Sequence, residues 1–498
     1  MSSINPPPAY RSEPTVSDAD VVATAREVLR EYDKDNVLVP CEMARVLIGS
    51  DLVDRIAPAV ADLLAGRAAG EGRPEVALLV DATLIQRLGV DLKQDVAQRL
   101  SQLFEVRTVV ASDGHAELHA SEAVISQATE AVRGVAAIVT VGGGTISDIG
   151  KLASRDAGGL PLVSVQTAAS VDGFTDNVSV ILRNGVKRTV DSRWPDVVIA
   201  DIETIAEAPV VMNLAGYGEI NSMFTAPADW RLANLVGVDP SFHPGPIRLL
   251  DEVGQGIEQW SAGLGREPSA TLRLTQALAL RGIATGVSGS TACLSGAEHL
   301  ISHMLDLWHG QLGVPIGLHG AQVGVGSVVA AAAWEMLFER MDAAGDDVVA
   351  RLRVPSPAEL EPLVLQAFAS ADPSGQIGAE CWADFAGKLA RVNAAHDQLV
   401  GLLGGWSVHQ TELRTLVRPS GQIARGLVAA GSAARFVDLQ PSVGPELVRW
   451  AVTNAPLMRN RFTVLDLLLL LGWWSPDDVQ EVLDRAERAA LPEAVRHA

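Results

Sequence analysis

The chain has 498 residues, of which 48% are hydrophobic and 20% charged, so it is long enough for about two or three folded domains. Its 60 acidic residues outnumber its 39 lysines and arginines and give a formal charge of −21, which excludes nucleic acid and anionic membranes as expected partners. The three cysteines, Cys41, Cys293 and Cys381, are widely spaced, which argues against a disulfide framework and favours a cytoplasmic protein.

Residues 1–35 are rich in proline, serine and charge, and we expect a flexible arm with one short helix at most. Between residues 36 and 205, short β-rich runs alternate with amphipathic stretches, which predicts βαβ units and a parallel sheet. The runs are EVALLV, VRTVVAS, AAIVTV, PLVSVQ and DVVIAD. Asn184 and Gly185 interrupt VSVILRNGVKRTV, and an Asn-Gly pair of this kind predicts a hairpin beside the sheet.

Residues 206–498 consist mainly of Ala- and Leu-rich segments with helical periodicity, such as ATLRLTQALALRGIATGV. They predict an all-α domain that follows the α/β domain. Chains of this kind usually hold their site in the cleft between the domains. No apolar run reaches the length of about 20 residues that spans a bilayer, so we do not expect a membrane protein.

Three successive glycines, Gly142, Gly143 and Gly144, join a predicted strand to a predicted helix that begins near Thr145. Glycines allow a phosphate to approach the backbone, and the N-terminus of a helix attracts anions. The pattern suits a pyrophosphate. It is not GxGxxG, and a purely structural turn explains it equally well.

Four of the ten histidines fall within one short segment. His299 and His303 lie four residues apart, on one face of a helix, and His319 follows a loop with glycines and a proline. This clustering indicates a metal site, while packed core histidines are the alternative. His309 is out of step with the pair and fits the C-terminal end of the helix.

Three carboxylates stand in apolar or glycine-rich surroundings: Asp172, Asp176 and Glu219. A carboxylate joined to imidazoles makes a site for zinc, iron(II) or nickel with open positions for a substrate. Each acid alone has an ordinary alternative, because Asp172 precedes a glycine as turn residues do, and Glu219 fits a helix N-terminus.

These segments together resemble the glycerol-1-phosphate dehydrogenase branch of the iron-containing alcohol dehydrogenase and dehydroquinate synthase superfamily. The resemblance runs over about residues 40–475, with a less familiar stretch between about 340 and 440. It implies an α/β N-terminal nucleotide-binding domain plus an all-α C-terminal domain, with the active site in the interdomain cleft, and a homo-oligomer. The matching segments are VDATLIQRLG, VGGGTISDIGK, VQTAASVDGF, GVKRTV, AGYGEINSMFTAPADW, SGAEHLISH, LHGAQVGVG and RNRFTVLDLL.

The resemblance also implies roles for single residues. Glu219, His299 and His319 would bind a divalent metal, which is zinc, iron or nickel. Asp172 would hold substrate hydroxyl groups, and His303 would relay the alcohol proton. Asp81 would contact the adenosine ribose and favour NAD over NADP. The residues implied to bind NAD are Asp81, Gly142, Gly143, Gly144, Thr145, Ile146, Asp148, Thr167, Ala168, Ala169, Ser170 and Asp176.

Four positions depart from the family pattern. Glu219 stands where the dehydrogenases usually have aspartate and the dehydroquinate synthases have glutamate, and Asp176 replaces a small hydroxyl residue. Ala292 and Met223 replace an arginine and a lysine. Because a phosphate dianion needs charged donors, these losses favour a substrate without phosphate.

We therefore expect an NAD- and metal-dependent alcohol dehydrogenase that acts on a hydroxylated substrate. A small-molecule alcohol fits, and so does the C-terminal threonine of a daptide-type peptide. One alternative is an sn-glycerol-1-phosphate dehydrogenase that uses Lys187 or Arg188 for the phosphate. A dehydroquinate synthase-like cyclase and a non-catalytic binding protein are the other two.

Overall fold

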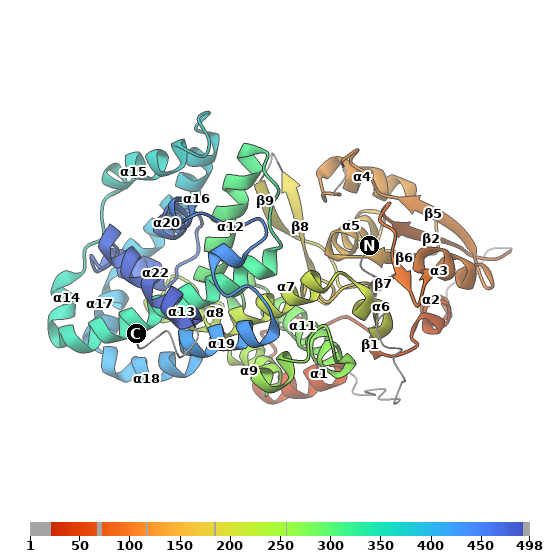
Figure 1. Ribbon diagram of the computed structural model, residues 1–498, viewed down its shortest axis with the longest axis horizontal. Helices are drawn as coiled ribbons and strands as arrows, with labels where there is room; N and C mark the ends of the chain where they lie inside the picture. The colour runs from red at the N-terminus through yellow and green to blue at the C-terminus, as the bar shows by residue number, and fades with distance from the viewer. Residues whose placement is uncertain (1–20, 67–71, 116–117, 184–185, 255, 492–498) are drawn as a thin grey trace, which may run out of the picture.

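The structure, a computed structural model, describes residues 21–66, 72–115, 118–183, 186–254 and 256–491. An α/β part and a helical part lie side by side along its long axis (Figure 1). The last strand of the main sheet ends at Asp201 and helices follow it, close to the predicted boundary at residue 205. That division into domains stays a prediction.

The α/β part is built on a six-stranded sheet whose order is β1-β10-β7-β6-β2-β5, with every neighbouring pair parallel. The predicted parallel sheet is thereby confirmed, and β1 adds an edge strand that the sequence analysis did not predict. The strands are β1 Arg45–Gly49, β2 Glu75–Val80, β5 Glu105–Val110, β6 Ala137–Gly142, β7 Leu162–Gln166 and β10 Val197–Asp201.

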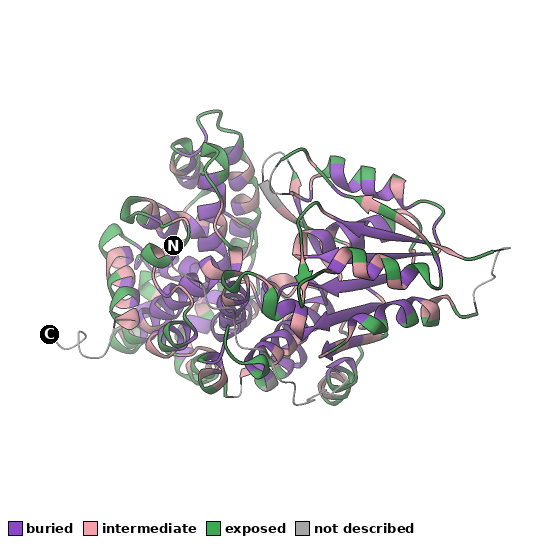
Figure 2. Cartoon of the chain, turned by 45° about the vertical axis from the view of Figure 1, so that its right-hand side comes forward, coloured by how far each residue is buried: buried purple, intermediate pink, exposed green. Residues whose placement is uncertain are grey.

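Two apolar layers enclose this sheet. Helices α2 (Ile56–Leu64) and α3 (Leu92–Ser101) cover one face. Helices α4 (Glu122–Ala131) and α5 (Gly144–Asp156) cover the other. Figure 2 shows the strands buried between helices whose outer sides are exposed, so the ends of the strands are what the α/β part offers to a ligand.

A β-hairpin stands apart from the main sheet, as the sequence predicted. Strands β8 (Val178–Arg183) and β9 (Val186–Asp191) pair antiparallel; the turn residues 184–185 lie outside the described residues. A second small antiparallel pair, β3 (Gln86–Arg87) and β4 (Val90–Asp91), precedes α3. The side chain of Asp91 accepts a hydrogen bond from the backbone of Gln94 at 3.1 Å and so caps α3.

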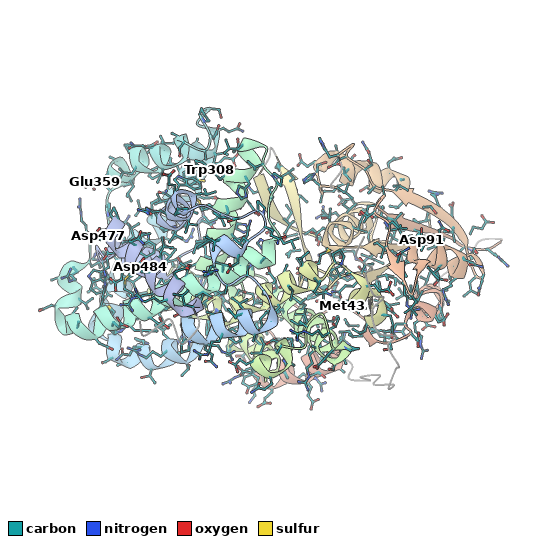
Figure 3. The ribbon with its side chains drawn as sticks, in the orientation of Figure 1. Met43, Asp91, Trp308, Glu359, Asp477 and Asp484 are labelled. Carbon is teal, nitrogen blue, oxygen red and sulfur yellow. The ribbon has the colours of Figure 1, made fainter. Side chains whose placement is uncertain are left out.

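The second part is helical, as predicted, and acidic side chains such as Glu359, Asp477 and Asp484 lie on its surface (Figure 3). Its longest helix, α13, is long and apolar enough to cross a membrane, but 89% of its most apolar window is buried, as expected of a core helix. The helices are α6 Ile202–Glu207, α7 Val210–Ile220, α8 Ala226–Val236, α9 Pro244–Gly254, α10 Ile257–Ser261, α11 Pro268–Ser288, α12 Ala297–Leu312, α13 His319–Ala344, α14 Val348–Arg351, α15 Pro357–Ala369, α16 Gln376–Ala394, α17 His396–Gly404, α18 Trp406–Leu416, α19 Ser420–Ala430, α20 Pro445–Asn454, α21 Val464–Leu470 and α22 Pro476–Ala490.

Residues 21–32 lie within the arm predicted over residues 1–35, for which the sequence allowed one short helix. They form helix α1 (Val21–Tyr32), which buries Val21, Val22 and Ala25 and packs against α9, α11 and β1. The reason is the spacing of these apolar residues, which places them on one face that gains free energy by burial. Residues 1–20 lie outside the described part of the chain.

Candidate active site

The glycine-rich turn lies at the carboxyl end of β6, beside the end of β2, where the chain order of the strands reverses. A Cβ atom on Gly142 would lie 2.7 Å from Ile146, and one on Gly144 would lie 2.8 Å from Val171. These two glycines are therefore required by packing. Around Gly143, no described atom lies within 4 Å of such a Cβ. The backbone is open there, at the N-terminus of α5, where an anion can approach.

Asp81 follows β2 directly, so it lies at the same edge of the sheet as the glycines. Its carboxylate pairs with the ammonium group of Lys93 and accepts a hydrogen bond of 3.0 Å from the hydroxyl of Thr83. The carboxylate is thus held in place next to a cation. Sequence analysis did not identify Lys93.

The segment of residues 167–170, which is predicted to bind NAD, follows β7 and is buried. The backbone N–H of Ala169 donates to Asn213 of α7 at 2.9 Å. A Cβ atom on Gly216 would lie 1.9 Å from the carbonyl oxygen of Ala169. The segment is therefore fixed directly against α7, the helix that carries Glu219.

Two residues predicted to bind the cofactor, Asp148 and Asp176, face a lysine. The ammonium group of Lys151 lies 3.1 Å from Asp148 and 2.6 Å from Asp176, and its side chain is 0% exposed. Burial raises the pKa of Asp176 to about 7; the charges of Asp172 and Asp148 add to this, and Lys151 opposes it. The three groups form a buried ion cluster, in which Lys151 was not identified from the sequence.

The three predicted metal ligands come together from three helices: Glu219 from α7, His299 from α12 and His319 from the start of α13. Their candidate ligand atoms lie within 4.8 Å of one another. The Nε2 atom of His299 is 3.3 Å from Oε1 of Glu219, and that of His319 is 3.7 Å from Oε2. Glu219 is 3% exposed, and its Oε2 has no hydrogen-bond donor among the described residues. A buried carboxylate oxygen in that state is costly, and a divalent cation held by this donor set would satisfy it.

Two side chains orient the imidazoles. Glu298 accepts a hydrogen bond from Nδ1 of His299 at 2.9 Å, and the hydroxyl of Ser302 lies 3.1 Å from Nδ1 of His319. Both rings therefore present Nε2 to the carboxylate of Glu219, an arrangement typical of metal-binding histidines. Burial disfavours the imidazolium form of His299, but the hydrogen bonds and charges of the two glutamates raise its pKa to about 9.

Close contact between α7 and α13 brings Glu219 and His319 together. A Cβ atom on Gly218 would lie 2.2 Å from the carbonyl oxygen of Gly320. One on Gly320 would lie 2.1 Å from the carbonyl oxygen of Ala215. Only glycine allows backbones to approach so closely, so these residues of GYGE and LHGAQVG position the site.

Arg281 of α11 was not identified from the sequence, although it lies at the centre of the site. Its side chain is 1% exposed and lies 3.1 Å from Asp172 and 3.1 Å from Glu219. Burial works against the ionisation of Glu219, yet the neighbouring imidazoles and the guanidinium group hold its pKa well below its usual range. A single charged residue inside the apolar run LALRGIATG was the signal that could have identified it.

His303 lies beside the three candidate ligands. Its ring centroid is 6.2 Å from that of His299 and 5.5 Å from that of His319, on which it is stacked. The ligand atoms of His303, Asp306 and His319 also lie within 4.8 Å of one another. This place suits either a proton relay or a ligand.

Arg188, the alternative phosphate-binding residue, faces acids of α16. Its guanidinium group lies 2.5 Å from Glu380 and 3.5 Å from Asp384. This contact joins the β8–β9 hairpin to the helical part. The side chain of Lys187 lies outside the described residues.

A buried carboxylate supports the start of α12. Asp229 of α8 accepts hydrogen bonds from the backbone N–H groups of Ala297 and Val464, both at 2.8 Å, and from the indole of Trp334 at 3.1 Å. Ala297 is the first residue of α12, which carries His299 two residues later. Asp229 therefore fixes the entry of the helix that carries a candidate ligand.

Comparisons with known proteins identify the family of this chain. A family model described as iron-containing alcohol dehydrogenase matches residues 55–209. The chain is 36% identical over 292 residues to a glycerol-1-phosphate dehydrogenase (NAD(P)+) of Haloquadratum walsbyi, a match that covers 57% of this chain and 76% of the relative. A glycerol-1-phosphate dehydrogenase (NAD(P)+) of Natronomonas pharaonis is 35% identical over 285 residues, which cover 57% of this chain and 75% of the relative.

Solved structures share the fold. A glycerol dehydrogenase of Schizosaccharomyces pombe matches with a TM-score of 0.55 at 15% identity, over 91% of this chain and 94% of the other. A maleylacetate reductase of Agrobacterium tumefaciens matches with a TM-score of 0.53 at 16% identity, over 92% of this chain and 99% of the other. The predicted fold class is thereby confirmed.

Proposed function

Because this chain belongs to the iron-containing alcohol dehydrogenase family, in its glycerol-1-phosphate dehydrogenase branch, we propose that Glu219, His299 and His319 hold the divalent metal of an NAD(P)-dependent dehydrogenase. The observation that carries this proposal is the buried carboxylate of Glu219, which lies against the imidazoles of His299 and His319 and whose Oε2 atom has no hydrogen-bond donor among the described residues. A metal bound there supplies a Lewis acid that polarises the substrate oxygen.

In the proposed reaction, a bound nicotinamide cofactor would supply the acceptor for a hydride from the carbinol carbon, and the hydroxyl group would lose its proton to the protein. Asp172 accepts hydrogen bonds from substrate hydroxyl groups, and Arg281 holds its carboxylate in place. His303, one helical turn from His299, takes the proton. The open backbone at Gly143 receives the pyrophosphate of the cofactor. Asp81 contacts the ribose, where we expect it to favour NAD.

The first substrate pair to test is glycerol 1-phosphate and dihydroxyacetone phosphate, because the relatives are named for the former. An unphosphorylated polyol is the second candidate, and one observation favours it. Three described cations, Lys151, Arg188 and Arg281, already face carboxylates, so each would have to give up an ion pair to bind a phosphate. The threonine-ended peptide remains a prediction that the relatives' names do not support.

The test is NADH formation by purified protein loaded with zinc, iron(II) or nickel, with the phosphorylated and unphosphorylated polyols in parallel. We expect the wild type to turn over substrate and Glu219→Gln to be inactive. Chelation should abolish the turnover of the wild type, and added metal should restore it. Turnover of a substrate without net change in NADH would indicate a cyclase instead. Binding of neither metal nor NAD(P) would revive the non-catalytic alternative and refute the proposal.

A further inference from the structure

We propose that Arg281 is a positioning residue that weakens metal binding and in exchange aligns the site for the substrate. It does so by linking the candidate ligand Glu219 to Asp172, the residue expected to hold substrate hydroxyl groups. The inference rests on the proposed function, because it assigns Arg281 a task in the same metal site. It concerns a residue to which neither the sequence pattern nor the comparisons give a role.

The contacts of the guanidinium group are distributed over three segments: the loop after β7, helix α7 and the turn that follows α7. Nε donates to Oδ2 of Asp172, in the loop after β7, at 3.1 Å. Nη2 donates to Oε1 of Glu219, in α7, at 3.1 Å, and Nη1 donates to the backbone carbonyl of Glu219 and to the hydroxyl of Ser222 at 2.9 Å. A planar fork can satisfy these acceptors together, whereas a lysine ammonium group cannot span them.

This geometry restricts Glu219. Its Oε1 atom is occupied by Arg281 and lies 3.3 Å from His299, which leaves Oε2 as the oxygen for a metal. Coordination through one oxygen, with a buried cation beside the other, is weaker than coordination by an unpaired carboxylate, since like charges repel strongly in a buried site. Arg281 therefore lowers metal affinity while it neutralises the buried Glu219 and the half-buried Asp172.

The same contacts fix Asp172 relative to the metal. Asp172 has a side-chain exposure of 19%, against 1% for Arg281, so the guanidinium group is buried more deeply than the carboxylate, which stays partly accessible. Without the arginine, the loop after β7 loses its charged link to α7 at this point. The carboxylate of Asp172 then holds the substrate hydroxyl groups less accurately, and small displacements of a substrate reduce turnover steeply.

The test compares Arg281→Met, Arg281→Lys and the wild type in two assays: the zinc dissociation constant, by competition with a chromophoric chelator, and kcat/KM. We expect Arg281→Met to bind zinc about tenfold more tightly and to lose about a hundredfold in kcat/KM. Arg281→Lys keeps the charge but not the fork, so its zinc affinity stays near that of the wild type while its kcat/KM falls. A merely structural loss would weaken both properties together.

Arg193→Met is the matched control, because Arg193 also pairs with a carboxylate, Asp196, and donates to Ser154 and Leu160 in the α/β part. It should leave the zinc dissociation constant unchanged. If folded Arg281→Met binds zinc as tightly as the wild type or more weakly, the inference is overturned. If Arg281→Met does not fold, Arg281→Lys decides: wild-type kcat/KM in that variant also overturns the inference. If the Glu219→Gln variant binds zinc as tightly as the wild type, the proposed metal site itself is overturned.

Discussion

Substitution of Gly320 by alanine should separate the two helices that carry Glu219 and His319. The added Cβ atom would lie 2.1 Å from the carbonyl oxygen of Ala215 and 3.0 Å from Cβ of Glu219. Ordinary contact begins at 3.4 Å, so α7 and α13 must move apart by about 1.3 Å, since backbone atoms cannot be displaced without moving their helix.

The cost has two parts. Overpacking of this kind destabilises a protein by about 1–3 kcal/mol, and the better helix propensity of alanine returns at most about 1 kcal/mol. Metal binding should suffer more, because the 3.7 Å separation between Oε2 of Glu219 and Nε2 of His319 widens. We expect zinc affinity to fall by about ten- to a hundredfold, the range seen when the support of a ligand is lost.

The assay is chelator competition at fixed pH, together with a thermal melt of the metal-free protein. Gly387→Ala in α16 is the control, because a Cβ atom there meets no described atom within 4 Å, and it should stabilise the protein by about 0.5–1 kcal/mol. Wild-type zinc affinity in Gly320→Ala would refute the view that glycine contacts set the geometry of the site.

Asp176→Asn should change the pH dependence of stability. The pKa of Asp176 is raised from 3.8 to about 7, so the folded protein holds a proton that the unfolded chain has released, and stability falls as pH rises from about 4 to 7. The melting temperature of Asp176→Asn should therefore drop less than that of the wild type between pH 5 and pH 8; parallel curves would contradict this. Glu298→Gln should weaken zinc binding about ten- to a hundredfold, because the carboxylate that orients His299 is lost, and unchanged affinity in the competition assay would argue that Glu298 has no such role.

The sheet was largely predictable because each of its central strands is a continuous apolar run. EVALLV coincides with β2, and AAIVTV, PLVSVQ and DVVIAD overlap β6, β7 and β10. The edge strand β1 (Arg45–Gly49) was missed because its apolar run is only three residues long, from Val46 to Ile48, between an arginine and a glycine. Helix α1 was expected only as one short helix within an arm, because its polar residues outweigh a narrow apolar face.

The candidate site was predictable only in part. The histidines and Glu219 were identifiable because their spacing or their segments carry a pattern. Lys151, Arg281 and Glu298 were not, since each is a charged residue within a helix, and most such residues face solvent. Their burial depends on contacts such as the one between Arg281 and Glu219, 62 residues apart, which only the packing of α11 on α7 creates.

The hydrogen bonds of Asp229 set the order in which the site can be completed during synthesis. Its partners Ala297 and Val464 lie 68 and 235 residues further along the chain. Until Val464 has left the ribosome, this buried carboxylate lacks one of its donors, and burying it costs more free energy. The helix that begins at Ala297 and carries His299 therefore reaches its final support only after the chain has been made as far as Val464. Shortened chains that end before this residue should lose the support of the site even though the nucleotide-binding sheet is complete.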